Sequence, residues 1–245
     1  MLKTSGEQWM LNRCMVYCCH SPTTLPSMSQ PYIVPPCLES VDILYADEHL
    51  LFIRKPHLLL SIPGRHPANQ DCVINRLRES YPAASMVHRL DLDTSGIMVM
   101  PLAPAVHSHI SRQFQERRVA KEYHAVVFGV VQKDRGEIDL PIAPDWSNRP
   151  RQKICPERGK SSLTRYTVQE RHSDRSRLLL HPETGRSHQL RIHLAAIDHP
   201  ILGCDLYAHP EALAASPRLL LHASRLGLEH PVTGQWIEKT CPAEF

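Results

Sequence analysis

The hydrophobic positions of the chain fall into short runs whose spacing changes along the sequence. The apolar runs 41–46 and 50–54 flank the polar residues 47–49, a pattern that predicts a β-hairpin. The uninterrupted apolar run 96–100 predicts a buried strand. Apolar residues return at helical spacing through 103–117, which predicts an amphipathic helix.

The remaining patterns complete an irregular alternation of strands and helices. Residues 71–80 have one apolar side and are expected to be helical, and 123–131 is expected to be a strand. Further strands are predicted at 163–169, 176–181, 219–228 and 235–240, with a turn at 231–234. The order lacks a regular strand–helix–strand series, so it favours an α+β fold with a mostly antiparallel mixed sheet flanked by helices and loops.

The first 40 residues differ from the rest of the chain. They contain closely spaced prolines with Ser and Thr between them, and proline supports neither a helix interior nor a central strand. We expect residues 1–40 to be a poorly ordered extension and linker, and 41–245 to be the folded domain. The sequence leaves open whether translation starts at Met1 or Met28. The prolines lie at positions 22, 26, 31, 35 and 36.

Composition indicates a cytoplasmic protein. Hydrophobic residues make up 42% of the 245 positions, enough for a sizeable core, and no apolar run approaches the ~20 residues of a membrane span. The N-terminal residues have no continuous apolar segment of the kind that a signal peptide requires. We therefore expect no contact with a membrane.

The eight cysteines are mostly isolated, which is not typical of a secreted disulfide framework. Cys14, Cys18, Cys19 and His20 form the densest group. A structural zinc site needs four well-spaced ligands, and no C-x-x-C pair occurs in the sequence. We expect free thiols and no metal.

The net charge of +3 does not by itself indicate a nucleic-acid partner, but the basic residues are clustered. One cluster spans 149–165 with a single acid, Glu157, and the other lies between 112 and 121 with Glu116. Such clusters neutralise RNA phosphates or simply face solvent, and charge alone does not decide between the two. The basic residues are Arg149, Arg151, Lys153, Arg158, Lys160 and Arg165 in the first, and Arg112, Arg117, Arg118 and Lys121 in the second.

A dense polar stretch, His88-Arg-Leu-Asp-Leu-Asp-Thr-Ser-Gly96, lies directly before the predicted buried strand. Loops held by a rigid scaffold are frequent sites of catalytic side chains. The alternative is a turn in which Asp93, Thr94 and Ser95 satisfy backbone donors, and for these three we favour that alternative. For Asp91 the residues alone leave the question open.

A second polar stretch runs from Thr184 to His193. Its apolar residues fit a strand or a helix, and Gly185–Ser187 provide a plausible N-cap, so we predict a helix over 188–197. His188 and His193 then lie about 140° apart around the helix axis. They would not share a metal ion as an i, i+4 pair does, which makes a metal hydrolase a minor alternative.

Taken together, these stretches resemble the RluA family of pseudouridine synthases in order and spacing, from about residue 42 to 245. The resemblance includes 142–155 and 199–203, and we expect no S4-type RNA-binding domain. It implies the pseudouridine synthase fold with a central cleft. The motifs that carry it are His88–Gly96, Lys121-x-Tyr123, Gly185–His193 and Leu221-His-Ala223.

The resemblance implies three catalytic residues. Asp91 corresponds to the family's invariant Asp, an ionised carboxylate that either attacks C1′ of the sugar or removes a proton from C2′. A carboxylate in a closed pocket needs a nearby cation, because burial alone raises a carboxyl pKa, and the family has an Arg at the position of Arg191. Tyr123 corresponds to the family's active-site Tyr, expected to stack on the uracil and help remove the C5 proton. From the residues alone, Tyr123 would be a core aromatic.

The resemblance also implies an RNA partner and no cofactor. The target uridine must be flipped out of its stack, and Arg89 matches the family residue that fills the vacated space. The loop 149–165 is expected to hold phosphates, with Arg112 and Arg118 as further RNA contacts. His88 and His222 are expected to be structural. The implied substrates are a hairpin-loop uridine of 23S rRNA and an anticodon stem-loop uridine of certain tRNAs, and the family expectation is a monomer.

Two other functions compete with this hypothesis. A non-catalytic RNA-binding module would share the basic clusters without needing Asp91, Tyr123 and Arg191 together. A glycosidase would need a second carboxylate as general acid, for which Asp93 is the candidate.

Overall fold

Strands β1 (Asp42–Ala46) and β2 (Leu50–Lys55) form the predicted hairpin in this computed structural model, which describes residues 32–245. The Asp47 carboxylate closes the turn, because it accepts hydrogen bonds from the backbone N–H groups of His49 (2.8 Å) and Leu50 (2.9 Å). An aspartate is suited to this place, since its short side chain satisfies donors that the turn leaves without a backbone partner.

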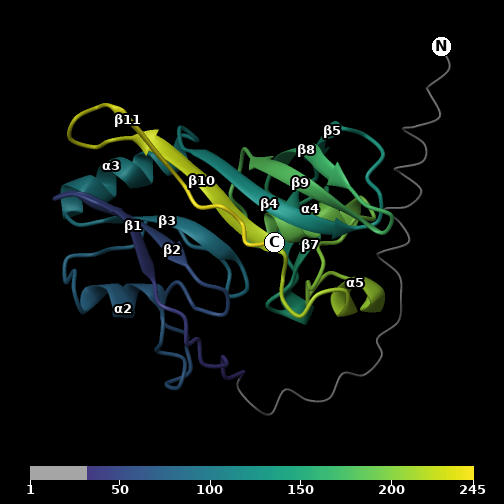
Figure 1. The fold of residues 1–245 in the computed structure, drawn as a ribbon, viewed down its shortest axis with the longest axis horizontal. Helices are drawn as coiled ribbons and strands as arrows, with labels where there is room; N and C mark the ends of the chain where they lie inside the picture. Colours follow the sequence, from purple (N-terminus) through teal and green to yellow (C-terminus); the bar gives the residue numbers. More distant parts are fainter. Residues whose placement is uncertain (1–31) are drawn as a thin grey trace. The chain divides into compact units, whose positions relative to one another are not determined.

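A mixed sheet runs through most of the described chain (Figure 1). Its strand order is β1-β2-β3-β10-β4-β9-β8-β5, and β11 pairs with β10 beside this path. Within it only β3 and β10 are parallel, so the α+β prediction with a mostly antiparallel sheet is confirmed. The other strands are β3 (Ser95–Pro101), β4 (Ala120–Phe128), β5 (Arg135–Asp139), β8 (Leu163–Arg171), β9 (Arg175–Pro182), β10 (Leu221–Glu229) and β11 (Trp236–Thr240).

The strand order brings distant motifs together at the middle of the sheet. In the register of β3 and β10, Ser95 pairs with His222, and in that of β10 and β4, Ala223 pairs with Tyr123. Gly96 is required at this junction, because its φ is +122° and a Cβ there would lie 2.2 Å from the carbonyl oxygen of Ala223. The start of β3, which follows the polar stretch 88–94, therefore lies beside β10 and close to β4.

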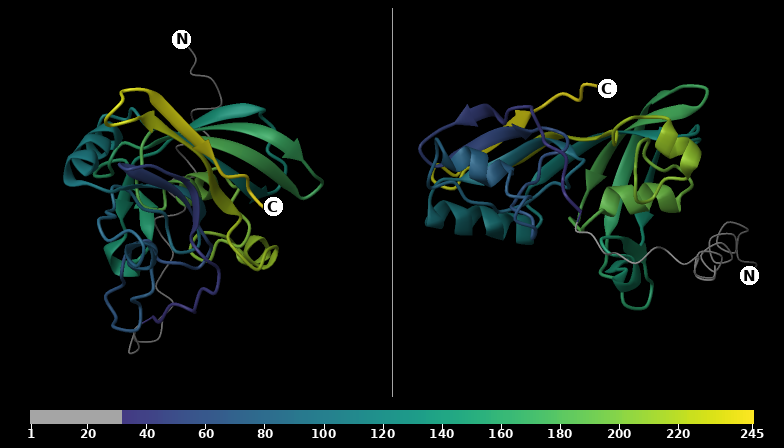
Figure 2. Two further views of the ribbon diagram at one scale, coloured as in Figure 1. Left: turned by 60° about the vertical axis from the view of Figure 1, so that its left-hand side comes forward. Right: turned by 90° about the horizontal axis from the view of Figure 1, so that it is seen from below.

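Four helices of the described chain pack beside the sheet (Figure 2). The amphipathic helix is confirmed as α3, with its Val106 and Ile110 buried. The helix predicted over 71–80 is shorter, and a fourth, α5, was not predicted. Helix α5 begins at a proline after His209, whose ring accepts a hydrogen bond from the N–H of Ala212. The bounds are α2 (Val73–Arg78), α3 (Pro104–Gln115), α4 (Gln189–Ala196) and α5 (Pro210–Ala214).

The hydrophobic core lies in two main clusters. One is built on the inner strands of the first half of the sheet and includes Phe52 and Ile110, and the other includes Leu178 and Leu194. Burying each such side chain contributes roughly 1.5–3 kcal/mol to folding. Tyr123 packs against both clusters, so it lies where the two halves of the sheet meet.

Strand β4 begins and ends three residues before the predicted strand 123–131. The apolar run continues past Phe128, but Gly129 has a φ of +78° and its N–H bonds to the carbonyl of Asp174 (2.8 Å), which ends the extended conformation. At the other end the strand takes in Ala120, because β10 pairs with β4 from that residue onward. Pairing with the neighbouring strands therefore determines where β4 begins and ends, and the apolar pattern alone predicts both ends at the wrong residues.

Residues 1–31 of the predicted extension 1–40 lie outside the described residues. The group Cys14, Cys18, Cys19 and His20 belongs to this part of the chain. Residues Ile33–Phe245 form one compact unit. Between residue 32 and β1 the described chain has no helix or strand. The Arg76 guanidinium donates to the carbonyls of Cys37 and Glu39 in this segment (both 2.6 Å). Within residues 32–245 no helix has the length and apolarity needed to cross a membrane.

Candidate active site

A cleft of about 560 Å³ collects the segments that the sequence singled out. All three predicted catalytic residues, Asp91, Tyr123 and Arg191, line it, and so does Arg89. The other lining residues come from the polar stretch before β3, the end of α3, the start of β4 and the segment that leads into α4. The complete lining consists of residues 87–91, Thr94, Ser111, Phe114, Gln115, Arg117, Lys121, Tyr123, 182–191 and Leu221.

Residues of the segment after β2 form hydrogen bonds with the loop that carries Asp91. The Ser61 hydroxyl donates to the carbonyl of Leu90 (2.7 Å) and accepts from the N–H of the same residue (3.2 Å). The His57 ring lies 2.9 Å from the carbonyl of Asp93. Because Leu90 and Asp93 bracket Asp91 on either side, these contacts restrict where its carboxylate can point.

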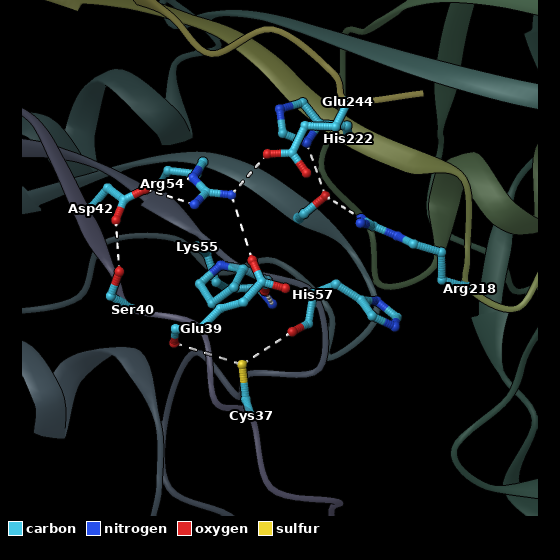
Figure 3. A network of polar contacts seen from close by, with 12 residues as sticks. Cys37, Glu39, Ser40, Asp42, Arg54, Lys55, His57, Arg218, His222 and Glu244 are labelled. Atoms are coloured by element: carbon cyan, nitrogen blue, oxygen red, sulfur yellow. Dashed lines mark hydrogen bonds and ion pairs between the residues drawn. The ribbon is translucent and has the colours of Figure 1, made fainter.

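Lys55 adds a buried ammonium to this support (Figure 3). Its Nζ donates to the carbonyls of Pro56 (2.9 Å), Leu59 (2.7 Å) and Leu92 (3.0 Å). Burial lowers the pKa of Lys55 to about 7, an effect that the negative charges of Asp93 and Asp91 oppose. Three carbonyl acceptors match the three N–H donors of an ammonium, so Lys55 joins the end of β2 to the Asp91 loop.

The start of β3 is anchored by a second group of polar side chains, which Figure 3 shows around His222. The Ser95 hydroxyl lies 2.9 Å from Nδ1 of His222 and accepts from Arg218 (2.8 Å). Nε2 of His222 lies 2.9 Å from the carbonyl of Cys241. Burial lowers the pKa of His222 to about 4, so the ring is neutral and structural. Ser95 is structural too, although it bonds side chains instead of the backbone donors expected of it.

His88 is also held in a structural contact at the cleft wall. Its Nε2 accepts from the N–H of Val99 (3.0 Å), and its ring stacks on Phe114 with 4.7 Å between centroids. Burial lowers the pKa of His88 to about 3, so this ring is neutral at neutral pH.

The Asp91 carboxylate faces two nitrogen groups at the floor of the cleft. Its Oδ2 lies 3.9 Å from Nη1 of Arg191 and 3.9 Å from Nε2 of His188. The side chain of Asp91 is 27% exposed and that of Arg191 only 2%, so the anion opens to the cleft while the cation lies behind it. The Asp91 carboxylate can therefore contact a ligand in the cleft, with the positive charge of Arg191 on its other side.

Arg191 has closer partners than Asp91. Its Nη2 contacts Oδ1 of Asp205, and its Nε lies 3.3 Å from the sulfur of Cys204. Burial alone would lower the pKa of Arg191, but Cys204, Asp91 and Asp205 raise it above its usual value and keep the guanidinium charged. Its contact with Asp91 is longer, with 3.9 Å between Nη1 and Oδ2. Asp205 was not predicted, because its place beside Arg191 depends on tertiary contacts.

Tyr123 fills the wall of the cleft between the two core clusters. Burial, followed by the charge of Asp91, raises the pKa of its phenol above the usual range, so the hydroxyl is protonated at neutral pH. Tyr123 therefore packs as a core aromatic and also lines the cleft.

Three further cations line the cleft that the sequence analysis did not select as site residues: Arg117, Lys121 and Arg186. Burial lowers the pKa of Lys121, with a smaller lowering by Arg117 and an opposing effect of Glu183. Lys121 could have been found from the sequence, because residues i and i+2 of a strand share a face and Tyr123 was already a candidate. Of the four basic residues between 112 and 121, Arg117 and Lys121 line the cleft.

Arg112 and Arg118, the predicted RNA contacts of that cluster, lie outside the cleft lining. Arg112 is exposed on α3. Arg118 is exposed as well and forms ion pairs with Glu116 (2.8 Å) and Glu229 (3.5 Å).

The basic segment 149–165, predicted to be a loop, is partly strand. Strand β7 (Gln152–Ile154) pairs with β6 (Ile142–Pro144), and a 3₁₀ turn (Trp146–Asn148) joins them into a hairpin, which we call the β6–β7 hairpin. The strands are only three residues long, too short for an apolar pattern to show. The loop prediction is wrong for this part.

The cations of the β6–β7 hairpin differ in their contacts. The Arg149 guanidinium lies 3.9 Å from the centre of the Trp146 ring, and Lys153 is exposed. Arg151 donates to the carbonyl of Leu206 and lies 5.6 Å from the centre of the Tyr207 ring. Arg165, in β8, pairs instead with Glu137 and Glu183.

The helix predicted over 188–197 is confirmed as α4, but its predicted N-cap is wrong. The N-cap residue is His188, with a φ of 56° and no side-chain cap. The Gln189 side chain instead fixes the segment before the helix, because its Oε1 accepts from the N–H of Arg186 (3.0 Å) and the hydroxyl of Thr184 (2.7 Å). This arrangement turns the ring of His188 toward the cleft.

The alternative chemistries find little support in the described part of the chain. Asp93, the candidate second carboxylate of a glycosidase, is not among the residues that line the cleft. The carboxylate that does line it besides Asp91, Glu183, is paired with Arg165. His193 lies within hydrogen-bond distance of Thr164 (2.9 Å) and the carbonyl of Leu140 (3.0 Å), so both of its ring nitrogens are engaged away from His188. No group of three potential metal ligands occurs among residues 32–245.

Comparison with known proteins agrees with this geometry. A family model described as RNA pseudouridylate synthase matches residues 49–196. Two curated relatives, both called dual-specificity RNA pseudouridine synthase RluA, are from Yersinia pestis (50% identical, covering 83% of this chain and 99% of the relative) and Pasteurella multocida (46%, covering 86% and 97%).

Solved structures show the same fold. Human RNA pseudouridylate synthase domain containing 1 superposes with a TM-score of 0.71 at 30% identity, covering 85% of each chain. Human RNA pseudouridylate synthase domain containing 4 superposes with a TM-score of 0.68 at 25% identity, covering 82% of this chain and 88% of the other. The family resemblance and the predicted fold are both confirmed. The chain belongs to the RNA pseudouridylate synthase family, and it is an isomerase.

Proposed function

We propose that this enzyme isomerises a uridine that is flipped into the cleft, with Asp91 as the catalytic carboxylate. The observation that carries the proposal is the position of Asp91, which is open to the cleft and backed by the buried guanidinium of Arg191. The reaction breaks the bond between the uracil N1 and C1′, turns the base, and joins C5 to C1′. Attack on C1′ and removal of a C2′ proton both begin with the same ionised carboxylate.

Tyr123 is proposed as the platform on which the uracil stacks. Its ring lines the cleft together with Asp91, and an aromatic face is a good partner for a base that has left its helix. Because its pKa is raised, the phenol is a poor proton acceptor at neutral pH. We therefore give the stacking role priority over the expected removal of the C5 proton.

RNA binding is proposed for the cations in and beside the cleft. Flipping a base costs a few kcal/mol of stacking and pairing. Arg89 is exposed at the cleft beside Asp91, where its side chain would enter the RNA and replace the flipped base. Arg117, Lys121 and Arg186 are placed to neutralise phosphates of the flipped nucleotide and its neighbours, and Arg112 and Arg118 remain candidates for outer contacts.

The proposed substrates are a hairpin-loop uridine of 23S rRNA and an anticodon stem-loop uridine of certain tRNAs. The support is the name of the relatives, dual-specificity RNA pseudouridine synthase, and the 97–99% of their length that this chain covers. An enzyme with these substrates would work in the cytoplasm, and we propose that it acts as a monomer. Mapping pseudouridines in total RNA from a deletion strain tests the substrates directly.

The reaction itself is tested by incubating the protein with uridine-labelled stem-loop RNA and analysing the nucleosides. Pseudouridine without free uracil supports the proposal. Release of free uracil would indicate a glycosidase, and RNA binding without either product would indicate a binding module.

Exchanging Arg149 and Lys153 for Gln is expected to weaken RNA binding and flatten its salt dependence. Each lost phosphate contact should reduce the slope of log K against log salt by up to about 0.9, or roughly 0.7 for a single-stranded loop. Arg151 stays unchanged in this variant, because its guanidinium also holds the carbonyl of Leu206. Binding isotherms at several salt concentrations provide the measurement.

The single-turnover rate of this double variant at saturating RNA should equal that of the wild type, since affinity no longer limits the rate there. The matched control exchanges Lys133 and Arg135, two exposed cations outside the cleft lining and the β6–β7 hairpin, and should bind RNA normally. A normal salt slope in the Arg149 and Lys153 variant would mean that this surface faces only solvent.

A further inference from the structure

Tyr207 lies between the β6–β7 hairpin and the groups that face Asp91. Its hydroxyl accepts a hydrogen bond from the backbone N–H of Gln152 in β7 (2.8 Å) and lies 2.7 Å from Nδ1 of His188. The guanidinium groups of Arg151 and Arg191 each lie 5.6 Å from the centre of the Tyr207 ring. One side chain thus contacts both the hairpin and the floor of the cleft.

The two hydrogen bonds of this hydroxyl fix the direction of proton donation. A backbone N–H can only donate, so the oxygen of Tyr207 must be the acceptor from Gln152. The phenol proton then has one acceptor within reach in the described part of the chain, Nδ1 of His188. With Nδ1 as acceptor, the proton of a neutral imidazole must be on Nε2.

The Nε2–H of His188 faces the catalytic carboxylate. Nε2 lies 3.9 Å from Oδ2 of Asp91. A small movement of the two side chains toward each other would form a hydrogen bond, and catalytic hydrogen bonds often shorten in this way when a substrate binds. Burial lowers the pKa of His188, an effect that Asp91 and Asp205 oppose and that Arg191 and Arg89 reinforce. The ring is therefore neutral and presents a donor to Asp91, not a second full charge.

We propose that Tyr207 is a positioning residue for the isomerisation, because it holds His188 in the tautomer whose Nε2–H faces Asp91 and so joins the β6–β7 hairpin to the reaction centre. This inference rests on the function proposed for Asp91. It adds a consequence: the backbone of the hairpin at Gln152, and not its phosphate contacts, bears on the geometry of the carboxylate through Tyr207 and His188.

Tyr207→Phe tests the proposal, because it removes the hydroxyl and keeps the ring under the two guanidinium groups. We expect the single-turnover rate at saturating RNA to fall between about tenfold and a hundredfold, the range for misplacement of a reacting group by a fraction of an ångström to an ångström. RNA affinity should change by less than about threefold, since no surface cation is removed. Conversion of labelled RNA and a binding isotherm give the two numbers.

Tyr166→Phe is the matched control. Tyr166 belongs to the same core cluster that Tyr207 packs against, and in residues 32–245 its hydroxyl has no hydrogen bond to a group of the cleft. This variant should react and bind like the wild type. A wild-type rate in Tyr207→Phe, or a loss of affinity with a normal rate, would overturn the proposal, because Tyr207 would then only support the fold or the hairpin.

The pH profile separates positioning from packing. Losing the phenol donor frees Nδ1 of His188 to take a proton, so the pKa of His188 should rise and the acid-side loss of rate should begin at higher pH than in the wild type. A purely structural role for Tyr207 predicts a lower rate with an unshifted profile, which would count against the proposal.

A measurement on the wild-type protein keeps the inference testable if Tyr207→Phe does not fold. The ¹⁵N shifts of the His188 ring at neutral pH should show the Nε2–H tautomer, with assignment by the His188→Gln variant. An Nδ1–H tautomer or an imidazolium would refute the proposal. If the wild-type enzyme forms no pseudouridine, the proposed function itself fails, whatever tautomer His188 has.

Discussion

Asp91→Asn is expected to yield no detectable pseudouridine while binding RNA with wild-type affinity. The exchange keeps the shape of the side chain and removes the negative charge on which both attack at C1′ and proton removal at C2′ depend. Loss of a residue that reacts directly commonly lowers the rate by at least about 10⁴-fold. Single-turnover conversion of labelled stem-loop RNA measures the rate, and a binding isotherm with the same RNA measures the affinity.

Folding should change little in this variant, because the Asp91 side chain is partly exposed and its contact with Arg191 is 3.9 Å long. Contacts of this kind contribute about 0–1 kcal/mol to stability. Asp93→Asn is the control, since Asp93 lies two residues away but outside the cleft lining. Turnover by Asp91→Asn at the wild-type rate would end the assignment. Inactivity of Asp93→Asn with release of uracil by the wild type would point to a two-carboxylate glycosidase instead.

The fold could be predicted best where one local pattern decided the structure. Strand β3 is apolar at every position after Ser95 because both of its faces are buried, and α3 shows its buried side through Val106 and Ile110. The β6–β7 hairpin was missed because its strands are only three residues long, too short for an apolar pattern to show. The bounds of β4 were misplaced because Gly129 ends the strand inside an apolar run.

The catalytic site was predictable in part, and for a different reason. The residues alone left Asp91 open and favoured a core aromatic for Tyr123, so both assignments depended on the family resemblance. The structure brings both residues into one cleft. Asp205 and Tyr207 were missed because nothing in their sequence spacing shows that they contact Arg191 and His188, which tertiary folding brings beside them.

Charge density proved a poor guide to which cations face the cleft. Arg112 and Arg118 were the predicted RNA contacts of their cluster, whereas Arg117 and Lys121 line the cleft. Arg118 is engaged with Glu116 and Glu229, and the direction of each side chain depends on where α3 ends and β4 begins. A cluster in the sequence therefore indicates a basic surface but does not say which of its members reach into the site.

Arg191→Met is expected to slow the isomerisation by about 100- to 1000-fold, the usual effect of removing one preorganised electrostatic partner from an active site. Met fills much of the space of the Arg side chain, so the loss of charge is the main change. RNA affinity should be nearly unchanged, because Arg191 is 2% exposed and lies behind Asp91. The single-turnover rate and the binding isotherm separate these two effects.

Arg191→Met should destabilise the fold less than the loss of one partner from a fully buried ion pair does. Breaking a fully buried ion pair costs about 3–5 kcal/mol, because a buried charge is left without a partner. The two carboxylates left by Arg191→Met are 27% exposed in Asp91 and 60% exposed in Asp205, so water can solvate both. We therefore expect a smaller loss, measured as a shift of the urea midpoint at constant m-value.

Asp205→Asn shows whether Arg191 acts on Asp91 or only through its closer partner. This variant removes the ion pair between Arg191 and Asp205 and leaves the guanidinium 3.9 Å from Asp91, so its rate should stay within a few-fold of the wild type. Arg191→Lys should fall between wild type and Arg191→Met, because it keeps a charge but not the planar fork that spans both carboxylates. Wild-type rates in Arg191→Met would reduce Arg191 to a structural residue. An equal loss of rate in Arg191→Met and Asp205→Asn would show that the reaction depends on the ion pair between Arg191 and Asp205, and not on the positive charge of Arg191 near Asp91.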